Sequence, residues 1–166
     1  GDVYKRQLVD TYKFTGNEEA LETAKSLGTW VYNRVSKWTD GVRKRVLSVE
    51  YGGMNDCMYD LYFFSGDPNH LEAAHQFDED RVKVNNKGEV TDRELLETVL
   101  TGNENTLNGK HANTTIPKFV GALKRYTVLK ARGEATEEDD KYLKYAEKFW
   151  DVAVDNYSYC LLYTSP

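Results

Sequence analysis

The side chains best suited to binding a polar ligand gather in two short segments of the sequence. The first is residues 50–62, in which a glycine pair at 52–53 comes directly before a predicted helix. Paired glycines at that place permit close approach of a ligand or of another backbone, because they carry no Cβ. Polar groups surround the pair, so Tyr51, Asn55 and Asp56 are candidate binding residues. A structural interpretation stays equally open, with a tight helix contact at the glycines and Asp56 in a cap or a buried network.

The second segment, residues 108–121, is dense in histidine, asparagine and threonine. Thr114 is predicted to cap a helix, with Pro117 in the first turn, where proline is tolerated. His111 and Asn113 then lie just ahead of a helix N-terminus, with its unpaired N–H groups and the positive end of its dipole. Both side chains can donate and accept hydrogen bonds, which suits the hydroxyls of a sugar. The alternative is a purely structural role for His111.

The composition is that of a folded protein whose ligand is not a polyanion. Of 166 residues, 40% are apolar and 13% are aromatic, which is enough to build a core. The mean hydropathy is -0.69, and no run of about 18 apolar residues could cross a membrane. The net charge is -5 and the Lys and Arg residues are scattered, so neither a nucleic-acid nor a membrane partner is expected. A neutral substrate fits this balance better.

An internal repeat supplies the elements that would position the two segments. Residues 12–17 and 62–67 both place aromatic side chains before a glycine and a capping Asn or Asp, and a leucine and an alanine follow at the same offsets. A looser third copy starts at Tyr126. Each copy is predicted to be a helix that ends at a left-handed glycine, followed by a capped second helix.

The spacing of the copies favours a toroid of helical hairpins over a regular solenoid. Successive copies start 50 and 64 residues apart, whereas tetratricopeptide units are about 34 residues long and HEAT units about 40–47. No stretch shows sustained period-two alternation, so the predicted fold class is all-α. By analogy, the chain is part of an (α/α)6 toroid of the six-hairpin glycosidase type, with about three hairpins present.

Apolar spacing and capping residues predict six helices. A capping box at 91–94 starts a short one inside a long connection at 82–110, which is rich in Asn, Gly and charge. A connection of this length is commonly a binding or lid loop, and a solvated insertion without a role is the open alternative. The predicted helices are Asn17–Lys37, Met54–Phe64, Pro68–Asp80, Asp92–Leu100, Thr115–Lys130 and Thr136–Asn156.

Both ends of the sequence are expected to be foreign to the natural protein. Residues 2–7 match one reading frame of the mosaic end of a transposon-based sequencing adapter, and residues 160–165 match its reverse complement. We therefore expect 1–7 and 160–166 to be adapter-derived, and 8–159 to be natural polypeptide cut at both ends. Cys57 is then the only natural cysteine, so neither a disulfide framework nor a thiolate metal site is expected. Localisation, cytoplasmic or secreted, stays open.

At this point the two segments carry a family resemblance. Residues 50–60 resemble the Tyr-Gly-Gly-Met-Asn-Glu segment of the β-L-arabinofuranosidase family, glycoside hydrolase families 127 and 146, formerly domain of unknown function 1680. Residues 109–121 resemble that family's Gly-Leu-His-Ala-Asn-Thr-Gln-Ile-Pro-Lys-Val-Ile-Gly segment. The hairpins match in order and approximate spacing, so the resemblance covers residues 8–159.

The resemblance implies part of an (α/α)6 catalytic domain from a bacterial retaining glycosidase. Such an enzyme removes terminal β-L-arabinofuranose, or a similar neutral sugar, from plant-type glycans in carbohydrate metabolism. In the family a zinc-bound cysteine is the nucleophile, further cysteines and a glutamate hold the metal, and another glutamate is the general acid/base. These cysteine motifs lie beyond Tyr159, so zinc is implied for the parent enzyme only, and neither a catalytic residue nor a metal ligand is expected in this chain, which alone should be inactive. The substrate-binding residues expected here are His111, Asn113, Tyr51, Asn55 and Asp56.

Two positions depart from the family pattern. Asp56 stands where the family often has Glu, which shortens the carboxylate side chain by one methylene. Thr115 stands where Gln is usual, which removes an amide that could reach a sugar. Both departures put the exact substrate in doubt more than the fold.

Two other functions remain open. A different sugar enzyme on a helical toroid, such as an epimerase, a lyase or an unsaturated glucuronyl hydrolase, would need cationic side chains for an acidic sugar, and neither segment contains an arginine. A non-catalytic helical repeat that binds protein partners would favour short regular units and an exposed apolar groove. The uneven units and polar helix starts favour the glycosidase.

Overall fold

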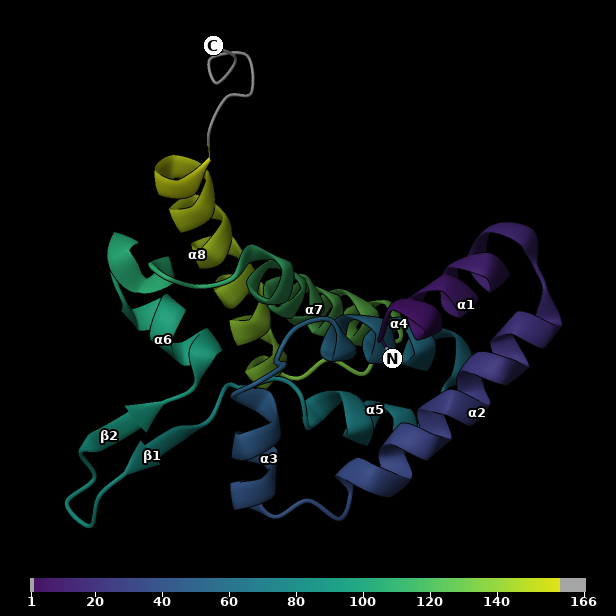
Figure 1. Cartoon of the computed structure of the whole chain (residues 1–166), viewed down its shortest axis with the longest axis horizontal. Helices are drawn as coiled ribbons and strands as arrows, with labels where there is room; N and C mark the ends of the chain where they lie inside the picture. The colour runs from purple at the N-terminus through teal and green to yellow at the C-terminus, as the bar shows by residue number, and fades with distance from the viewer. Residues whose placement is uncertain (1, 159–166) are drawn as a thin grey trace.

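Three helical hairpins form the body of the described part of the chain (Figure 1). The structure is a computed structural model that describes residues 2–158, with side chains from residue 5 onward. The hairpins pair α1 (Asp2–Thr15) with α2 (Glu18–Val35), α4 (Met54–Ser65) with α5 (Pro68–His75), and α7 (Ala112–Ala131) with α8 (Asp140–Tyr157). The connecting segments contain α3 (Asp40–Leu47), β1 (Val82–Val84), β2 (Val90–Arg93), α6 (Leu95–Thr101) and the 3-10 turns η1 (Glu104–Leu107) and η2 (Glu137–Asp139).

Glycines in the left-handed conformation follow the first helix of each hairpin. The φ angle is 71° at Gly16, 62° at Gly66 and 71° at Gly133, a region that residues with a Cβ rarely adopt. In the first two hairpins the side chains of Asn17 and Asp67 then accept hydrogen bonds from backbone N–H groups of the next helix. These turns confirm the hairpin repeat predicted from the sequence.

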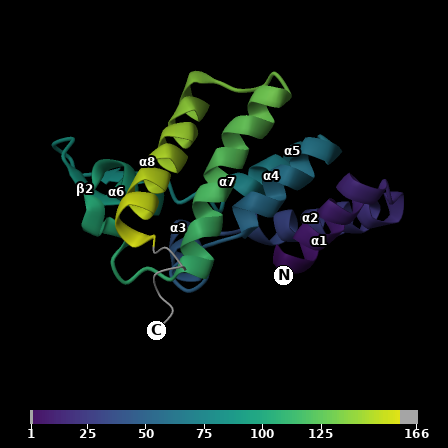
Figure 2. The ribbon, with the colours of Figure 1, turned by 90° about the horizontal axis from the view of Figure 1, so that it is seen from above.

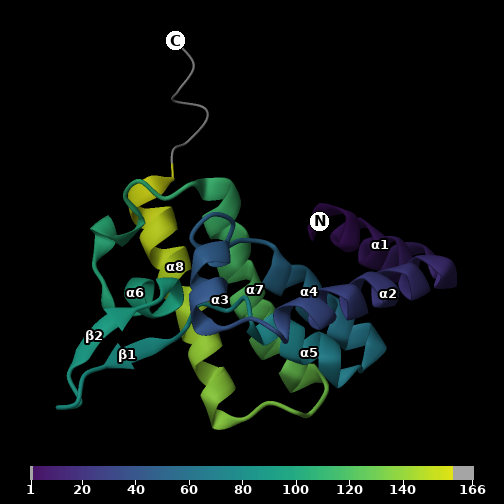
Figure 3. The ribbon, with the colours of Figure 1, turned by 60° about the horizontal axis from the view of Figure 1, so that its bottom comes forward.

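The first helices of the three hairpins run parallel to one another. Tyr51, just before α4, contacts Thr115 near the start of α7, and Tyr62 near the end of α4 contacts Glu134 just beyond α7. The start of α4 therefore lies beside the start of α7, and the end of α4 lies beside the end of α7. α1 and α4 also contact each other start to start and end to end. The second helices return antiparallel, with α8 beside α7 in Figure 2 and α2 beside α1 in Figure 3. This arrangement of inner and returning helices is that of an (α/α) toroid, so the predicted all-α fold class is confirmed.

Two apolar clusters hold the hairpins together. One lies between α1, α2, α4 and α5, with Met58 and Tyr59 fully buried in it. The other lies between α6, α7 and α8, where Phe119 stacks on Phe149 with the ring centroids 4.2 Å apart. Leu129 of α7 belongs to the first cluster. Because α7 takes part in both clusters, it links the first two hairpins to α6 and α8.

Several predicted helix boundaries were wrong. α5 ends at His75 and not at Asp80, because the chain turns away there and its next carbonyl groups bind cations from α3 and α7. α7 begins at Ala112, ahead of the predicted start, and α8 begins at Asp140, after η2. α3 was not predicted at all. It is short, and the side chain of Thr39 caps its start.

The long connection contains a β-hairpin, which the all-helical prediction missed. β1 and β2 pair antiparallel, with Val82 opposite Arg93 and an irregularity after Lys83. Every residue of both strands is exposed, and the hairpin projects away from the helices (Figure 1). Residues 91–93 belong to β2, so the capping box predicted there was wrong, and Glu94 occupies the cap position of α6 without a side-chain cap bond. Strands this short leave too little alternation for detection.

α1 is continuous from Asp2 to Thr15, so it crosses the expected boundary between adapter-derived and natural residues. That boundary stays a prediction, and the expected adapter-derived segment 160–166 lies outside the described residues. Within residues 2–158, no helix has both the length and the apolar character needed to cross a membrane.

Candidate functional site

Close contact between α4 and α7 brings the two polar segments of the sequence together. A Cβ built on Gly52 would lie 1.9 Å from the carbonyl oxygen of Thr114, and one built on Gly121 would lie 2.3 Å from the side chain of Asn55. Real Cβ atoms cannot approach that closely, so both positions need glycine. Gly52 therefore makes the tight backbone contact that the structural interpretation of the first segment predicted. The starts of α4 and α7 therefore lie side by side and form one site.

The start of α7 is built around the backbone of His111. His111 is the N-cap residue, in an extended conformation with φ -80° and ψ 119°, and it makes no side-chain cap bond. Its carbonyl oxygen accepts from the backbone N–H groups of Thr114 and Thr115 at 3.2 and 2.9 Å. The hydroxyls of the same two threonines donate to it at 3.0 and 2.8 Å. Thr114 is thus inside the first turn, so its predicted cap role was wrong, and Pro117 lies in the helix interior.

The side chains of His111 and Asn113 remain open to solvent. Both residues are exposed, and neither side chain has a hydrogen-bond partner among the described residues. They lie at the positive end of the α7 dipole, beside N–H groups that a helix leaves unpaired. An imidazole and an amide in this position can each donate to and accept from a hydroxyl-rich ligand.

Tyr51 and Asn55 are instead engaged in the contact between the two helices. Asn55 is completely buried, and its Nδ2 donates to the carbonyl oxygen of Lys118 at 3.0 Å. Tyr51 is half-buried, and its hydroxyl lies 2.9 Å from Oγ1 of Thr115. Thr115 is itself buried. The position at which the chain departs from the family's Gln therefore faces the helix contact in this structure and not open solvent.

Asp56 belongs to a small charged cluster shared by α1, α4 and α7. Its carboxylate lies 2.6 Å from Nη1 of Arg6 and 3.2 Å from Nζ of Lys124. Lys124 also pairs with Asp60. Burial raises the pKa of Asp56, and the two cations oppose that rise. Arg6 is one of the residues expected to be adapter-derived. If that prediction is correct, the natural protein lacks the ion pair between Arg6 and Asp56.

A turn at residues 76–81 supports α7 from the side of α5, and sequence reasoning missed it. Lys118 is fully buried, its ammonium group bonds the carbonyl oxygen of Phe77, and it lies 3.1 Å from the carboxylate of Glu79. Burial lowers the pKa of Lys118. Glu79 has a left-handed φ of 54°, which a non-glycine residue adopts only when its surroundings impose it. The sequence signal that could have revealed this contact is Lys118 itself, a lysine directly before Phe119 in an apolar stretch.

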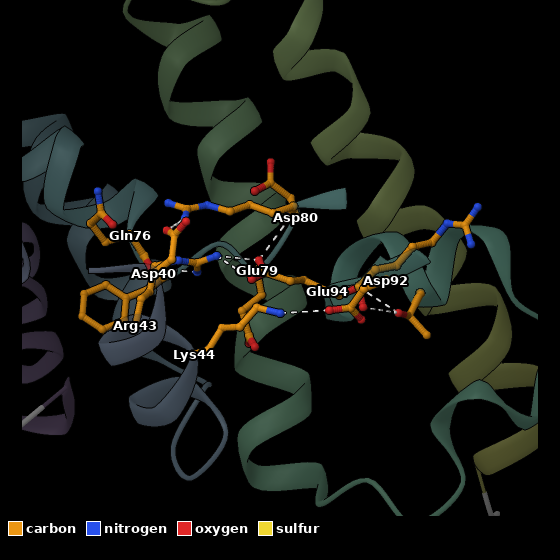
Figure 4. A network of polar contacts seen from close by, with 12 residues as sticks. Asp40, Arg43, Lys44, Gln76, Glu79, Asp80, Asp92 and Glu94 are labelled. Carbon is orange, nitrogen blue, oxygen red and sulfur yellow. Dashed lines mark hydrogen bonds and ion pairs between the residues drawn. The ribbon is translucent and has the colours of Figure 1, made fainter. Parts of the chain in front are cut away.

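The same turn is tied to α3 and to the β-hairpin (Figure 4). Nη2 of Arg43 lies 2.6 Å from each carboxylate oxygen of Glu94, and Nη1 donates to the carbonyl oxygen of Gln76 at 3.3 Å. Lys44 and Asp92 form a second, exposed pair at 2.9 Å beside it. α3, the turn and the base of the β-hairpin are thus joined in one polar network.

A second group of largely buried titratable side chains surrounds Arg125, which bonds Asp78 of the turn. Asp78 receives hydrogen bonds from Arg125 at 2.8 Å and from the hydroxyl of Tyr59 at 2.6 Å, and burial raises its pKa to about 6. Burial lowers the pKa of the neighbouring His75 to about 4. These groups join α4, α5, α7 and α8 and do not reach the side chains of His111 and Asn113, so their role is to hold the helices.

The described residues offer no arrangement suited to zinc. Within residues 2–158 no group of three His, Cys, Asp or Glu side chains is placed to hold a metal ion. Cys57 is buried in the apolar core, and its Sγ lies 3.4 Å from the carbonyl oxygen of Met54. A zinc centre of thiolates and a carboxylate does not fit these side chains. No step of the chemistry is therefore assigned to a metal here.

The fold and the site define a protein of the helical-toroid class, with a polar site at one end of its inner helices. The sequence model of the family described as β-L-arabinofuranosidase, GH127 catalytic domain, matches residues 3–161, and the chain belongs to this family. The resemblance carried by the two segments is thereby confirmed, and the family is one of glycoside hydrolases. A search of curated proteins found no match to the sequence.

Proposed function

We propose that the chain is part of the catalytic domain of a retaining glycosidase that releases terminal β-L-arabinofuranose from plant-type glycans. The observation that carries the proposal is the pair His111 and Asn113. Both side chains are exposed and unpartnered among the described residues, at the start of an inner helix whose backbone is firmly held. Membership of the family supports the reaction class.

The chemistry of the pair favours a neutral sugar. A furanose presents hydroxyl groups that both donate and accept, and an imidazole and an amide can satisfy both roles. Neither residues 50–62 nor residues 108–121 contain an arginine that could pair with an acidic sugar. Hydrogen bonds from the two side chains would fix the sugar ring in one orientation, and such bonds contribute to catalysis when they strengthen in the transition state.

The nucleophile, the general acid/base and the zinc are proposed to belong to a part of the catalytic domain beyond this chain. When bound, zinc would keep a cysteine ionised at neutral pH, so that the thiolate can attack the sugar. Within this chain the proposed work is limited to binding and orienting the glycan. The isolated chain is accordingly proposed to be inactive.

A test of this proposal uses the longer protein that carries the complete domain. His111→Ala and Asn113→Ala should each lower kcat/KM on an aryl β-L-arabinofuranoside by about fivefold or more, the value of one hydrogen bond. The helical circular dichroism spectrum should not change, because both side chains are exposed. Asn33→Ala is the matched control, since Asn33 is an exposed asparagine in the last turn of α2.

Two results would refute the proposal. Activity on the arabinofuranoside that is unaffected by both variants would exclude the pair from the sugar site. A preference of the unaltered enzyme for unsaturated uronides would favour the glucuronyl hydrolase alternative instead.

A further inference from the structure

We propose that Tyr51 and Thr115 are positioning residues, which orient His111 for the sugar and do not bind the sugar themselves. The proposal rests on the proposed function, in that it takes His111 to be the sugar contact. It is carried by a continuous chain of hydrogen bonds between α4 and α7.

The direction of that chain follows from its chemistry. The carbonyl oxygen of His111 can only accept, so the hydroxyl of Thr115, at 2.8 Å, donates its single proton to it. Oγ1 of Thr115 therefore has only acceptor capacity left. The hydroxyl of Tyr51, at 2.9 Å, must donate to it. The protons run in one direction, from Tyr51 through Thr115 to His111, and such ordered chains polarise one another.

This chain ends on the atom that determines how α7 begins. The carbonyl oxygen of His111 receives four donors from Thr114 and Thr115, although a carbonyl has only two lone pairs. The hydrogen bond from the hydroxyl of Tyr51 determines how strongly the hydroxyl of Thr115 donates to this carbonyl oxygen. It thereby holds the extended backbone of His111, whose φ and ψ set the direction in which the imidazole leaves the helix start.

The close contact at Gly52 makes the chain possible. Gly52 is next to Tyr51 and touches the backbone of Thr114, with no space for a Cβ. The two helix starts can therefore approach until a tyrosine hydroxyl on one side reaches a threonine hydroxyl on the other. Because Thr115 is buried and the single hydroxyl proton of Tyr51 is engaged with it, neither side chain can donate a hydrogen bond to a sugar without breaking this contact.

The experiment is a mutant cycle in the protein that carries the complete catalytic domain. Tyr51→Phe removes only the hydroxyl of the tyrosine. Thr115→Val removes the hydroxyl that links Tyr51 to His111 and keeps a side chain of nearly the same size. Each should lower kcat/KM on an aryl β-L-arabinofuranoside by about fivefold. Thr115→Ser keeps the hydroxyl and should restore most of the activity. Tyr32→Phe is the matched control, because the hydroxyl of the half-buried Tyr32 has no hydrogen-bond partner among the described residues.

The decisive comparison is made in the background of His111→Ala. If Tyr51 acts through His111, Tyr51→Phe has no further effect in that background. An undiminished fivefold loss there would overturn the proposal, because Tyr51 would then contact the sugar independently. If His111→Ala leaves no measurable rate, His111→Gln serves as the background, since an amide keeps one donor and one acceptor.

A second measurement separates this proposal from the proposed function. Hydrogen exchange of the backbone amide of Thr115, which donates to His111, needs no sugar. Tyr51→Phe should speed that exchange by about fivefold. An unchanged rate overturns the positioning role whatever the enzyme does. Faster exchange together with a His111→Ala variant of full activity would support the positioning role and refute only the sugar contact.

Discussion

At the scale of single residues, burial divides the polar side chains of this chain into two groups. His111 and Asn113 face solvent without partners among the described residues. Asn55 and Lys118 are instead buried, and their side chains bond the backbone of α7 and of the turn after α5, respectively. A buried polar group is costly unless it is hydrogen-bonded, so the second group is best explained as structural. The first group has no such explanation and is the one assigned to a ligand.

The half-buried His75, whose Nε2 atom is buried, leads to a prediction about pH. The pKa of His75 is lowered to about 4 by burial and by the nearby Arg125, whereas an unfolded chain has an ordinary histidine near 6.5. Between these values the imidazole binds more protons in the unfolded state, so the contribution of His75 to stability rises with pH from about 4 to about 6.5 and is lost as the pH falls through that window. The slope from this group is at most about 1.4 kcal/mol per pH unit.

His75→Gln should flatten this dependence, because glutamine does not titrate. The measurement is the midpoint of urea unfolding of the complete domain between pH 4 and pH 7, for the unaltered protein and the variant. His111→Gln is the control, since the side chain of His111 is exposed in the folded state. Equal slopes for the His75 variant and the unaltered protein would show that the imidazole is not buried uncharged.

The residue types of the site could be predicted from the sequence, but their partners could not. The density of histidine, asparagine and threonine ahead of a predicted helix marked His111 and Asn113 as candidates, and their contact with a ligand stays a prediction. For Asn55 the sequence specified a helix start and left open which side of that helix faces α7. Which side faces α7 depends on the register of α4 against α7. That register is possible because Gly121, far away in the sequence, leaves space for the side chain of Asn55. Long-range register of this kind leaves no local pattern.

At the scale of elements, the helices that were predicted are those with an apolar stripe of their own. α2, α4 and α8 each bury such a stripe. α3 is capped by Thr39 but, like the β-hairpin, it lacks such a stripe, and tertiary ion pairs hold both elements in place. Arg43 of α3 is almost completely buried and binds Glu94 at the base of the hairpin. An element stabilised by a partner far away in the sequence escapes any local rule.

The Arg43–Glu94 pair should therefore matter far more than its neighbour. Glu94→Ala would leave a buried guanidinium group without its carboxylate, and the free energy of unfolding should fall by about 3 kcal/mol. Lys44 and Asp92 join the same two elements but are largely exposed, so Asp92→Ala should lower the free energy of unfolding far less than Glu94→Ala does. Urea unfolding of the complete domain measures both. Equal effects of the two variants would mean that α3 is not held by the buried pair.

At the scale of the whole molecule, three hairpins leave apolar surface uncovered. Ile116, Val120 and Leu123 form an exposed stripe along one face of α7, and Trp150 and Val154 form another on α8. Contiguous apolar surface on a soluble protein marks a contact with something else or a tendency to aggregate. Helical units of a toroid bury such faces only against the neighbouring unit.

The isolated 166-residue chain should consequently self-associate. Size-exclusion chromatography with light scattering is expected to show oligomers or aggregates, with a broad thermal transition in place of a cooperative one. Replacing Val120 and Leu123 by lysine puts charge on the α7 stripe without touching the site residues, and should increase the monomer fraction. The matched control replaces Thr23 and Asn33, exposed polar residues of α2, by lysine and adds the same charge away from the stripe. A monomer with a sharp melt in the unaltered chain would contradict this prediction, because it would show that three hairpins bury enough surface to fold without a neighbour.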